Sequence, residues 1–168
     1  MNQYGKRVLI TYGGGSIKRT APGHDKSLYD LVKDTLTDKQ VFELGGIQPN
    51  PKFNPSVLDG VRMCQDNDID VILAVGGGSV LDCTKAIAGV AGTLKTKVTD
   101  NVEEAWDIVC GRKPTTAAVP IVDIITMAAT GSEYDMGGVI SRTETNDKLA
   151  YFSKLVFPAV SFIDPTYT

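Results

Sequence analysis

Two glycine-serine turns, each directly after an apolar stretch, are the part of this sequence best suited to hold a phosphate. Gly76–Ser79 follow the apolar residues Val71–Val75, and Gly13–Ser16 follow Arg7–Tyr12. Glycines lack Cβ atoms, so backbone N–H groups can approach an anion, and a following helix leaves the N–H groups of its first turn unpaired. Because the pattern occurs twice, we expect both turns to face one ligand. The predicted pyrophosphate cradle comprises Gly14, Gly15, Ser16, Gly77, Gly78 and Ser79.

The same residues have a structural interpretation. Three glycines between a strand and a helix can form a tight turn without binding any ligand. Ser79 with Asp82 resembles an ordinary helix-capping pair. The spacing also differs from the GxGxxG pattern of common dinucleotide sites. On these residues alone, both interpretations stay open.

Apolar periodicity predicts the elements that position these turns. Buried strands are expected at Arg7–Tyr12, Gln40–Leu44, Val71–Val75, Ala117–Ile125 and Ala159–Ile163. Helices are expected at Ser27–Leu36, Pro55–Asn67, Val80–Val90 and Val102–Val109, and a β-hairpin at Val139–Arg142 and Lys148–Ser153. This alternation predicts an α/β fold: a Rossmann-like, doubly wound, mostly parallel sheet with helices on both faces, plus a β-hairpin. The loops that follow the strands would then meet at one ligand-binding edge.

The composition limits the classes of function. The chain has 168 residues, 42% of them apolar and 22% charged, which fits a single globular domain over residues 1–168. A net charge of -3 argues against a nucleic-acid or anionic-membrane surface. We expect no membrane partner, because no apolar run is long enough to cross a bilayer and the first residues lack the apolar segment of a signal peptide.

Cysteine and histidine usage narrows the chemistry further. Cys64, Cys83 and Cys110 are far apart and form no CxxC pair, as expected for reduced thiols in a cytoplasmic protein. His24 is the only histidine, so neither a histidine-rich metal site nor a histidine-centred catalytic triad is expected. We therefore predict no metal ligands and no catalytic residues within this chain.

Five motifs, in this order, extend the interpretation beyond periodicity. They are Val-Leu-Ile-Thr-Tyr-Gly-Gly-Gly-Ser-Ile-Lys, Gly-Gly-Ile-Gln-Pro-Asn-Pro, Ala-Val-Gly-Gly-Gly-Ser-Val-Leu-Asp, Ala-Ala-Thr-Gly-Ser-Glu and Phe-Ile-Asp-Pro-Thr-Tyr-Thr. Together they resemble the iron-containing (group III) alcohol dehydrogenases, in the branch of NADPH-dependent aldehyde reductases and butanol dehydrogenases. The resemblance runs from about Arg7 to the last residue.

The resemblance implies a domain and its function. Members of this family have an N-terminal α/β domain that binds a nicotinamide dinucleotide and a C-terminal helical domain that binds a divalent metal (iron or zinc) through one Asp and three His. This sequence matches the first domain, and the second is absent from it. The implied function is the cofactor-binding part of an enzyme that transfers hydride between nicotinamide and a small alcohol or aldehyde, with little expected activity alone. An exposed domain face would favour a homo-oligomer.

The resemblance also implies roles for individual residues. Gly77, Gly78 and Ser79 match the pyrophosphate-binding turn of the family, and Asp82 matches a carboxylate near the cofactor. Helix capping is the alternative for Asp82. Lys148 matches a lysine that reaches the cofactor ribose, and a solvated hairpin lysine is its alternative. The segment that lines the adenosine and phosphate side is matched by Thr126, Thr130, Gly131 and Ser132.

Cofactor choice depends on the end of the first strand. NAD-preferring members of the family carry an Asp near the position of Tyr12 or Gly13, where its carboxylate accepts from the ribose 2′-hydroxyl. This sequence has no carboxylate there, and Ser16 and the basic pair Lys18-Arg19 follow. We therefore expect NADP. NAD is the alternative, because the basic pair is equally compatible with ordinary surface charge.

Two other functions compete with this interpretation. A stand-alone, non-enzymatic nucleotide-binding module would bind the cofactor without turnover, and a dehydroquinate synthase-like lyase would share the fold and the glycine turn. The Ala-Thr-Gly-Ser-Glu and Phe-Ile-Asp-Pro-Thr-Tyr-Thr motifs argue against the lyase. Asp135, just after the former motif, adds a negative charge that would disfavour a phosphate nearby.

Overall fold

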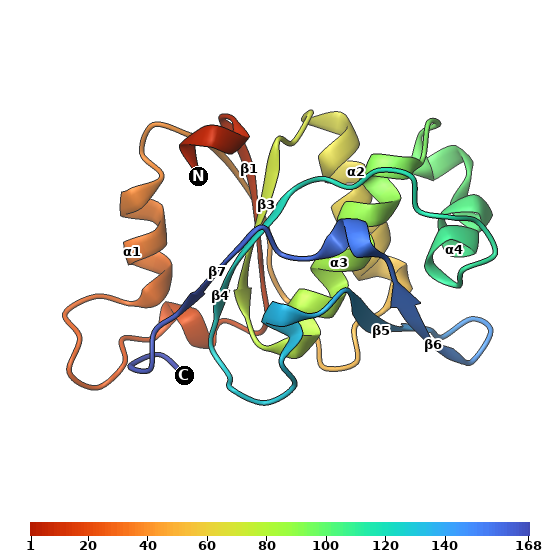
Figure 1. Cartoon of the computed structure of the whole chain (residues 1–168). Helices are drawn as coiled ribbons and strands as arrows, with labels where there is room; N and C mark the ends of the chain where they lie inside the picture. Colours follow the sequence, from red (N-terminus) through yellow and green to blue (C-terminus); the bar gives the residue numbers. More distant parts are fainter.

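A computed structural model describes residues 1–168 and contains a central parallel sheet with helices on both faces (Figure 1). The sheet has five strands in the order β2-β1-β3-β4-β7, and every neighbouring pair is parallel. The strands are β1 (Arg7–Tyr12), β2 (Gln40–Leu44), β3 (Val71–Gly76), β4 (Ile121–Ile125) and β7 (Val160–Ile163). The predicted fold class and the existence of all five strands are confirmed.

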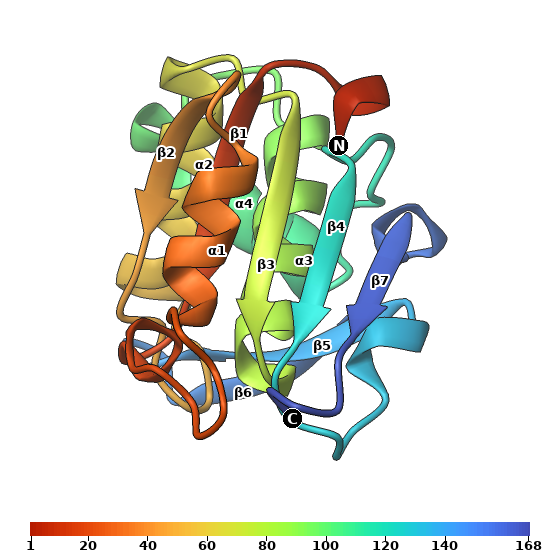
Figure 2. The same cartoon turned by 90° about the vertical axis from the view of Figure 1, so that its left-hand side faces the viewer.

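The helices divide unequally between the two faces. Helix α1 (Leu28–Thr35) covers one face, and α2 (Leu58–Asp66), α3 (Gly78–Thr93) and α4 (Val102–Val109) lie on the other (Figures 1 and 2). Two hydrophobic clusters correspond to these layers: one of 11 buried residues includes α1, and one of 27 includes α2, α3 and α4. No helix in the structure combines the length and apolar character needed to cross a membrane.

The strand order creates a topological switch point. The chain passes from β1 outward to β2 through α1, and then returns across β1 to form β3 on its other side. The connections that leave β1 and β3 therefore run to opposite faces of the sheet. In open parallel sheets, a ligand-binding crevice forms at the carboxyl ends of the strands where the connections diverge in this way.

Most element boundaries agree with the apolar pattern to within two residues, and two starts differ by more, for local reasons. The α-helix expected from Pro55 begins at Leu58, because a wider π-helical turn, Phe53–Val57, precedes it. The strand expected from Ala117 begins at Ile121, directly after Pro120, which has no N–H to donate to a neighbouring strand. Thr93 Oγ1 instead accepts from the N–H groups of the segment before this proline, at 3.0 and 3.3 Å.

The predicted hairpin is confirmed as β5 (Gly137–Arg142) paired antiparallel with β6 (Asp147–Phe152). It forms a separate two-stranded sheet beside α3 and does not join the central sheet (Figure 1). The buried ring of Tyr151 in β6 reaches α3: the Cβ position of Gly89 would lie 1.8 Å from the Tyr151 hydroxyl. Only glycine at that point of α3 leaves room for the tyrosine, so the hairpin and the helix are packed as one unit.

Candidate functional site

The two glycine turns lie side by side at the carboxyl edge of the sheet (Figure 2). Tyr12 and Val75, which precede the turns, are partners in the β1–β3 register. The Cβ position of Gly13 would lie 3.7 Å from the side chain of Val80, in the first turn of α3. The structure thus brings together two turns that are more than 60 residues apart in the sequence.

The turn after β3 presents the amino end of a long helix. Gly77 is the N-cap of the 16-residue helix α3, and Val80 and Leu81 donate their N–H groups to its carbonyl at 3.0 and 3.2 Å. The N–H groups of Gly78 and Ser79 precede these first intrahelical bonds, so they have no partner within the helix. No side chain caps the helix, so the alternative in which Ser79 and Asp82 form a capping pair is wrong.

Side chains at two glycines of this turn would overlap neighbouring side chains. A Cβ on Gly78 would lie 2.8 Å from Thr130 Oγ1, and one on Gly76 would lie 2.5 Å from the Val80 side chain. In the turn after β1, Gly15 has a φ of 96°, a left-handed conformation that favours glycine. The Cβ position of Gly14, by contrast, has no atom within 4 Å and points into open space.

A cleft of about 310 Å³ opens beside the amino end of α3. Five of the predicted site residues line it: Gly78, Ser79, Asp82, Thr130 and Ser132. The hydroxyls of Thr130 and Ser132 are hydrogen-bonded to each other at 2.7 Å. The remaining lining residues, which the sequence analysis did not select as site residues, are Asp135, Gly137, Gly138, Val139 and Phe152.

Asp82 joins α3 to the hairpin. Its Oδ2 accepts a hydrogen bond from the N–H of Val139 at 3.0 Å. The two elements approach closely because Gly138 has no side chain: a Cβ at Gly138 would lie 2.9 Å from the Cβ of Asp82. Burial raises the pKa of Asp82, while the Val139 N–H and Lys85 act in the opposite direction. The carboxyl group therefore has a structural role at the wall of the cleft in addition to any ligand contact.

The other predicted site residues lie outside the lining of this cleft. Thr126 follows β4 and donates its N–H to the carbonyl of Gly76 at 3.0 Å, so it borders the central turn. Lys148, on β6, donates to Asn50 Oδ1 at 2.8 Å and thereby reaches the loop after β2. Gly14, Gly15 and Ser16 belong to the neighbouring turn and do not line the cleft. The role of each in ligand binding stays a prediction.

A cluster of charged and aromatic side chains lies at the end of β1 and β2, next to the first turn. Glu43 accepts from the hydroxyls of Tyr12 and Tyr29 and from Lys33 Nζ, at distances of 2.8 to 3.2 Å. Lys18 Nζ lies 4.9 Å from the ring centroid of Tyr12 and 4.6 Å from that of Tyr29. A hydrogen bond with Tyr12 raises the pKa of Lys18. An ordered, solvent-exposed cation thus stands beside Gly13–Ser16.

The structure places no group of three His, Cys, Asp or Glu side chains where they could hold a metal ion together. Nδ1 of His24, the single histidine, is hydrogen-bonded to the hydroxyl of Tyr167 at 2.9 Å, and the two rings are stacked. The residues present therefore do not provide a binding site for a catalytic metal.

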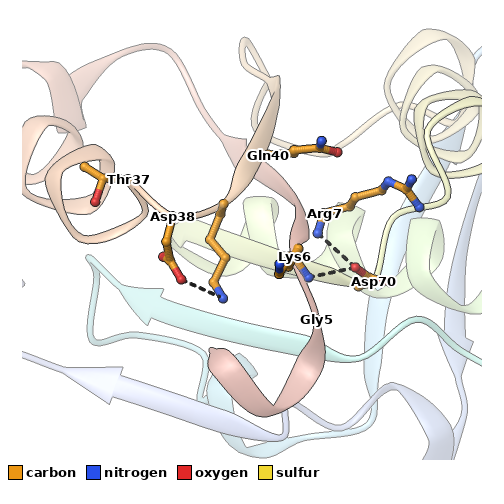
Figure 3. A pocket seen from close by; sticks show the side chains of 8 residues that line it. Gly5, Lys6, Arg7, Thr37, Asp38, Gln40 and Asp70 are labelled. Atoms are coloured by element: carbon orange, nitrogen blue, oxygen red, sulfur yellow. Dashed lines mark hydrogen bonds and ion pairs between the residues drawn. The ribbon is translucent and has the colours of Figure 1, made fainter.

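A polar depression of about 700 Å³ lies at the opposite, amino-terminal edge of the strands (Figure 3). There Asp70 accepts from the backbone N–H groups of Lys6 and Arg7, at 2.8 and 2.9 Å, and Lys39 pairs with Asp38 at 3.3 Å. These groups satisfy one another and join the starts of β1 and β3.

Comparison with known proteins gives a consistent result. The sequence model for the family described as iron-containing alcohol dehydrogenase matches residues 1–165. The chain is 45% identical over 170 residues to a probable NADH-dependent butanol dehydrogenase 1 of Bacillus subtilis, covering 100% of this chain and 40% of that protein. It is 41% identical over 162 residues to the NADPH-dependent aldehyde reductase YqhD of Escherichia coli, covering 96% and 39%.

Solved structures show the same relationship. The crystal structure of E. coli YqhD superposes with a TM-score of 0.83 at 41% identity, covering 98% of this chain and 39% of that one. An NADH-dependent butanol dehydrogenase A of Thermotoga maritima gives a TM-score of 0.83 at 36% identity, covering 98% and 38%. The chain therefore spans about 40% of the length of the curated relatives it matches.

Proposed function

Since this chain belongs to the iron-containing alcohol dehydrogenase family, we propose that it is the dinucleotide-binding domain of an NADP-dependent alcohol dehydrogenase or aldehyde reductase. In this proposal, residues 1–168 bind and orient the cofactor. The complete enzyme transfers hydride between the nicotinamide and a small alcohol or aldehyde, as the names of the related proteins suggest.

The observation that carries the proposal is the pairing of the two glycine turns at the switch point of the sheet. The turn after β3 offers the N–H groups at the amino end of α3, and the cleft beside it is lined by the hydroxyl-bearing side chains of Ser79, Thr130 and Ser132. Backbone N–H groups and hydroxyls are the donors that bind a pyrophosphate at a helix terminus. We assign the pyrophosphate to this edge, at the amino end of α3 and the cleft beside it.

The preference for NADP rests on charge at the first turn. Gly13–Ser16 contain no carboxylate that would repel a 2′-phosphate, and Lys18 stands beside them as an ordered cation. The nearest acidic side chain of the cluster, Glu43, is already paired with Lys33 and with two tyrosine hydroxyls. The cluster therefore keeps a net positive charge, which favours the dianionic 2′-phosphate.

We propose that this chain is inactive alone. The family is named for its iron, whereas this chain brings together no set of metal-ligating side chains. A stand-alone, non-enzymatic nucleotide-binding module remains the second candidate, because it requires no metal. The lyase alternative has no support from the family match.

Two further properties follow from the proposal. Three cysteines without disulfide partners suit a reducing compartment, so we assign the protein to the cytoplasm. Exposed apolar side chains, including Phe152 at the cleft and Leu155 and Phe157 beyond the end of β6, would favour self-association of this chain. A light-scattering mass that rises with concentration is the expected result, and a constant monomer mass would refute self-association.

The test of the proposed function is a titration of the chain with NADPH and, separately, with NADH, followed by cofactor fluorescence. Saturable binding that favours NADPH is expected, with no oxidation of NADPH when an aldehyde is added. A preference for NADH would overturn the cofactor assignment but keep the domain assignment. Turnover of an aldehyde by the chain would overturn the proposed inactivity.

A further inference from the structure

Lys85 of α3 is a fully buried lysine whose ammonium group makes three contacts. It donates to the carbonyls of Ser132 and Gly137 at 2.7 and 3.0 Å, and it forms an ion pair with Asp135. The partners lie in the connection between β4 and β5 and at the first residue of β5, far from α3 in the sequence. A buried ammonium group is stable only when its donors are satisfied, so this connection and Lys85 are coupled.

The same connection contacts β7 on its other side. Ser161 donates its hydroxyl hydrogen to an oxygen of the buried Asp123 at 2.7 Å and lies 3.0 Å from the carbonyl oxygen of Glu133. The segment from Ser132 to Gly137 therefore lies between α3, which it contacts through Lys85, and the edge of the central sheet. It contributes Ser132, Asp135 and Gly137 to the lining of the cleft.

Asp135 is the member of this segment that matters for an anionic ligand. Its side chain is half exposed and lines the cleft that also contains Gly78 and Ser79, at the amino end of α3. Alone, its charge would repel a pyrophosphate there. In the structure one carboxylate oxygen of Asp135 accepts hydrogen bonds from Lys85 Nζ and from the N–H of Gly137, the latter at 3.0 Å. The buried ammonium group of Lys85 therefore compensates the negative charge of Asp135.

We propose that Lys85 is a positioning residue for the cofactor site. Lys85 holds the Ser132–Gly137 segment in the place where it lines the cleft, and it neutralises Asp135 so that the cleft accepts a pyrophosphate. This inference rests on the proposed cofactor site, and it adds a residue that makes no contact with the ligand itself. It also removes the objection that Asp135 raises against phosphate binding at this edge.

Three variants separate charge compensation from simple structural support: Lys85→Met, Asp135→Asn and the double variant. Met keeps much of the length of the lysine side chain without the charge, and Asn keeps the acceptor oxygen that Gly137 and Lys85 use. Lys97→Met is the control, because Lys97 pairs with Asp66 on the surface at 2.6 Å. The readouts are the dissociation constant for NADPH at low and high salt, and hydrogen exchange of the Gly137 amide without cofactor.

For Lys85→Met we expect binding of NADPH to weaken roughly tenfold, the effect of about 1.4 kcal/mol from one nearby uncompensated charge. The loss should shrink at high salt. The double variant should bind NADPH more tightly than Lys85→Met, because it removes the uncompensated charge although it does not restore the contacts of Lys85, and Asp135→Asn alone should bind NADPH at least as tightly as the unmodified chain. Lys97→Met should show no change. A purely structural role would leave the double variant as weak as Lys85→Met.

Hydrogen exchange keeps the test independent of the proposed function. Exchange at Gly137 should accelerate in Lys85→Met even without cofactor, because the segment loses its contacts with α3. If the unmodified chain binds no dinucleotide, the proposed function fails, while faster exchange would still support the positioning of the segment. Three results would each overturn the proposal: unchanged exchange at Gly137, a double variant that binds NADPH no more tightly than Lys85→Met, and weaker NADPH binding by Asp135→Asn. The last result does not depend on how well Lys85→Met folds.

Discussion

Gly78 and Thr130 are in such close contact that a Cβ on the glycine would lie 2.8 Å from the threonine Oγ1. This contact joins the first turn of α3 to the loop after β4, and both belong to the lining of one cleft. A methyl group at this position would therefore displace the Thr130 side chain, whether or not a phosphate also approaches the N–H group of Gly78.

Replacing Gly78 and Gly14 separately distinguishes packing from ligand binding. Gly78→Ala should lower the free energy of unfolding by about 1–3 kcal/mol, because the new methyl group overlaps Thr130. Gly14→Ala should leave stability nearly unchanged, because nothing lies within 4 Å of its Cβ position. Urea unfolding measures both changes. If the turn after β1 faces the cofactor, Gly14→Ala should nevertheless weaken NADPH binding; equal affinity would remove this turn from the site.

Asp123 should make stability depend on pH. It is fully buried on β4, one of its oxygens has no hydrogen-bond partner, and burial raises its pKa to about 6. The unfolded chain loses this proton near pH 4, so between about pH 4 and 6 the native state binds more protons and stability falls as pH rises. Above the native pKa the loss, up to about 3 kcal/mol, is complete.

Asp123→Asn tests this pH dependence. The amide oxygen can still accept from Ser161, and the variant has no charge to bury. Because burial also raises the pKa of Asp82, the informative quantity is the difference between the unmodified chain and the variant, measured by urea unfolding from pH 4.5 to 8. The variant should gain stability relative to the unmodified chain as pH rises. A difference that is constant with pH would contradict the assignment.

Lys18 should select between the two nicotinamide cofactors. In Lys18→Met, affinity for NADPH should fall about tenfold while affinity for NADH stays the same, because only NADPH carries the 2′-phosphate that the ammonium group would attract. Arg19→Met is the matched control, since only Lys18 is held over the rings of Tyr12 and Tyr29. Fluorescence titrations of both variants with both cofactors measure the effect. Equal losses for NADPH and NADH would exclude recognition of the 2′-phosphate by Lys18.

The central sheet was predictable because parallel strands buried on both faces are continuous apolar runs. Val71–Val75 shows this directly: each of its residues is buried, and the strand extends only to Gly76. The glycine turns were predictable for the same reason, since they follow these runs. Strand order and the docking of the hairpin on α3 could not be predicted, because they depend on contacts between residues distant in the sequence.

The second wall of the cleft was the part of the site that sequence reasoning missed. Of these residues the sequence places only Val139 in an element, the hairpin, and Asp135 enters only through its charge; nothing local indicates that Asp135, Gly138 and Val139 meet α3. One signal was present: Lys85 is the only charged residue between Cys83 and Leu94, in a helix that is otherwise nearly all buried there. A buried lysine needs hydrogen-bond acceptors, so this position indicates that another segment of the chain packs against α3 and supplies them.

Localisation of the cofactor tests the central claim most directly. Backbone amide shifts of the ¹⁵N-labelled chain would be measured during titration with NADPH. Binding at the carboxyl edge predicts the largest changes at Gly13–Ser16 and at Gly77–Ser79, with none around Lys6, Lys39 and Asp70 in the depression of Figure 3. Changes confined to that depression, or saturable binding that leaves both glycine turns unperturbed, would contradict the assignment of this edge as the cofactor site.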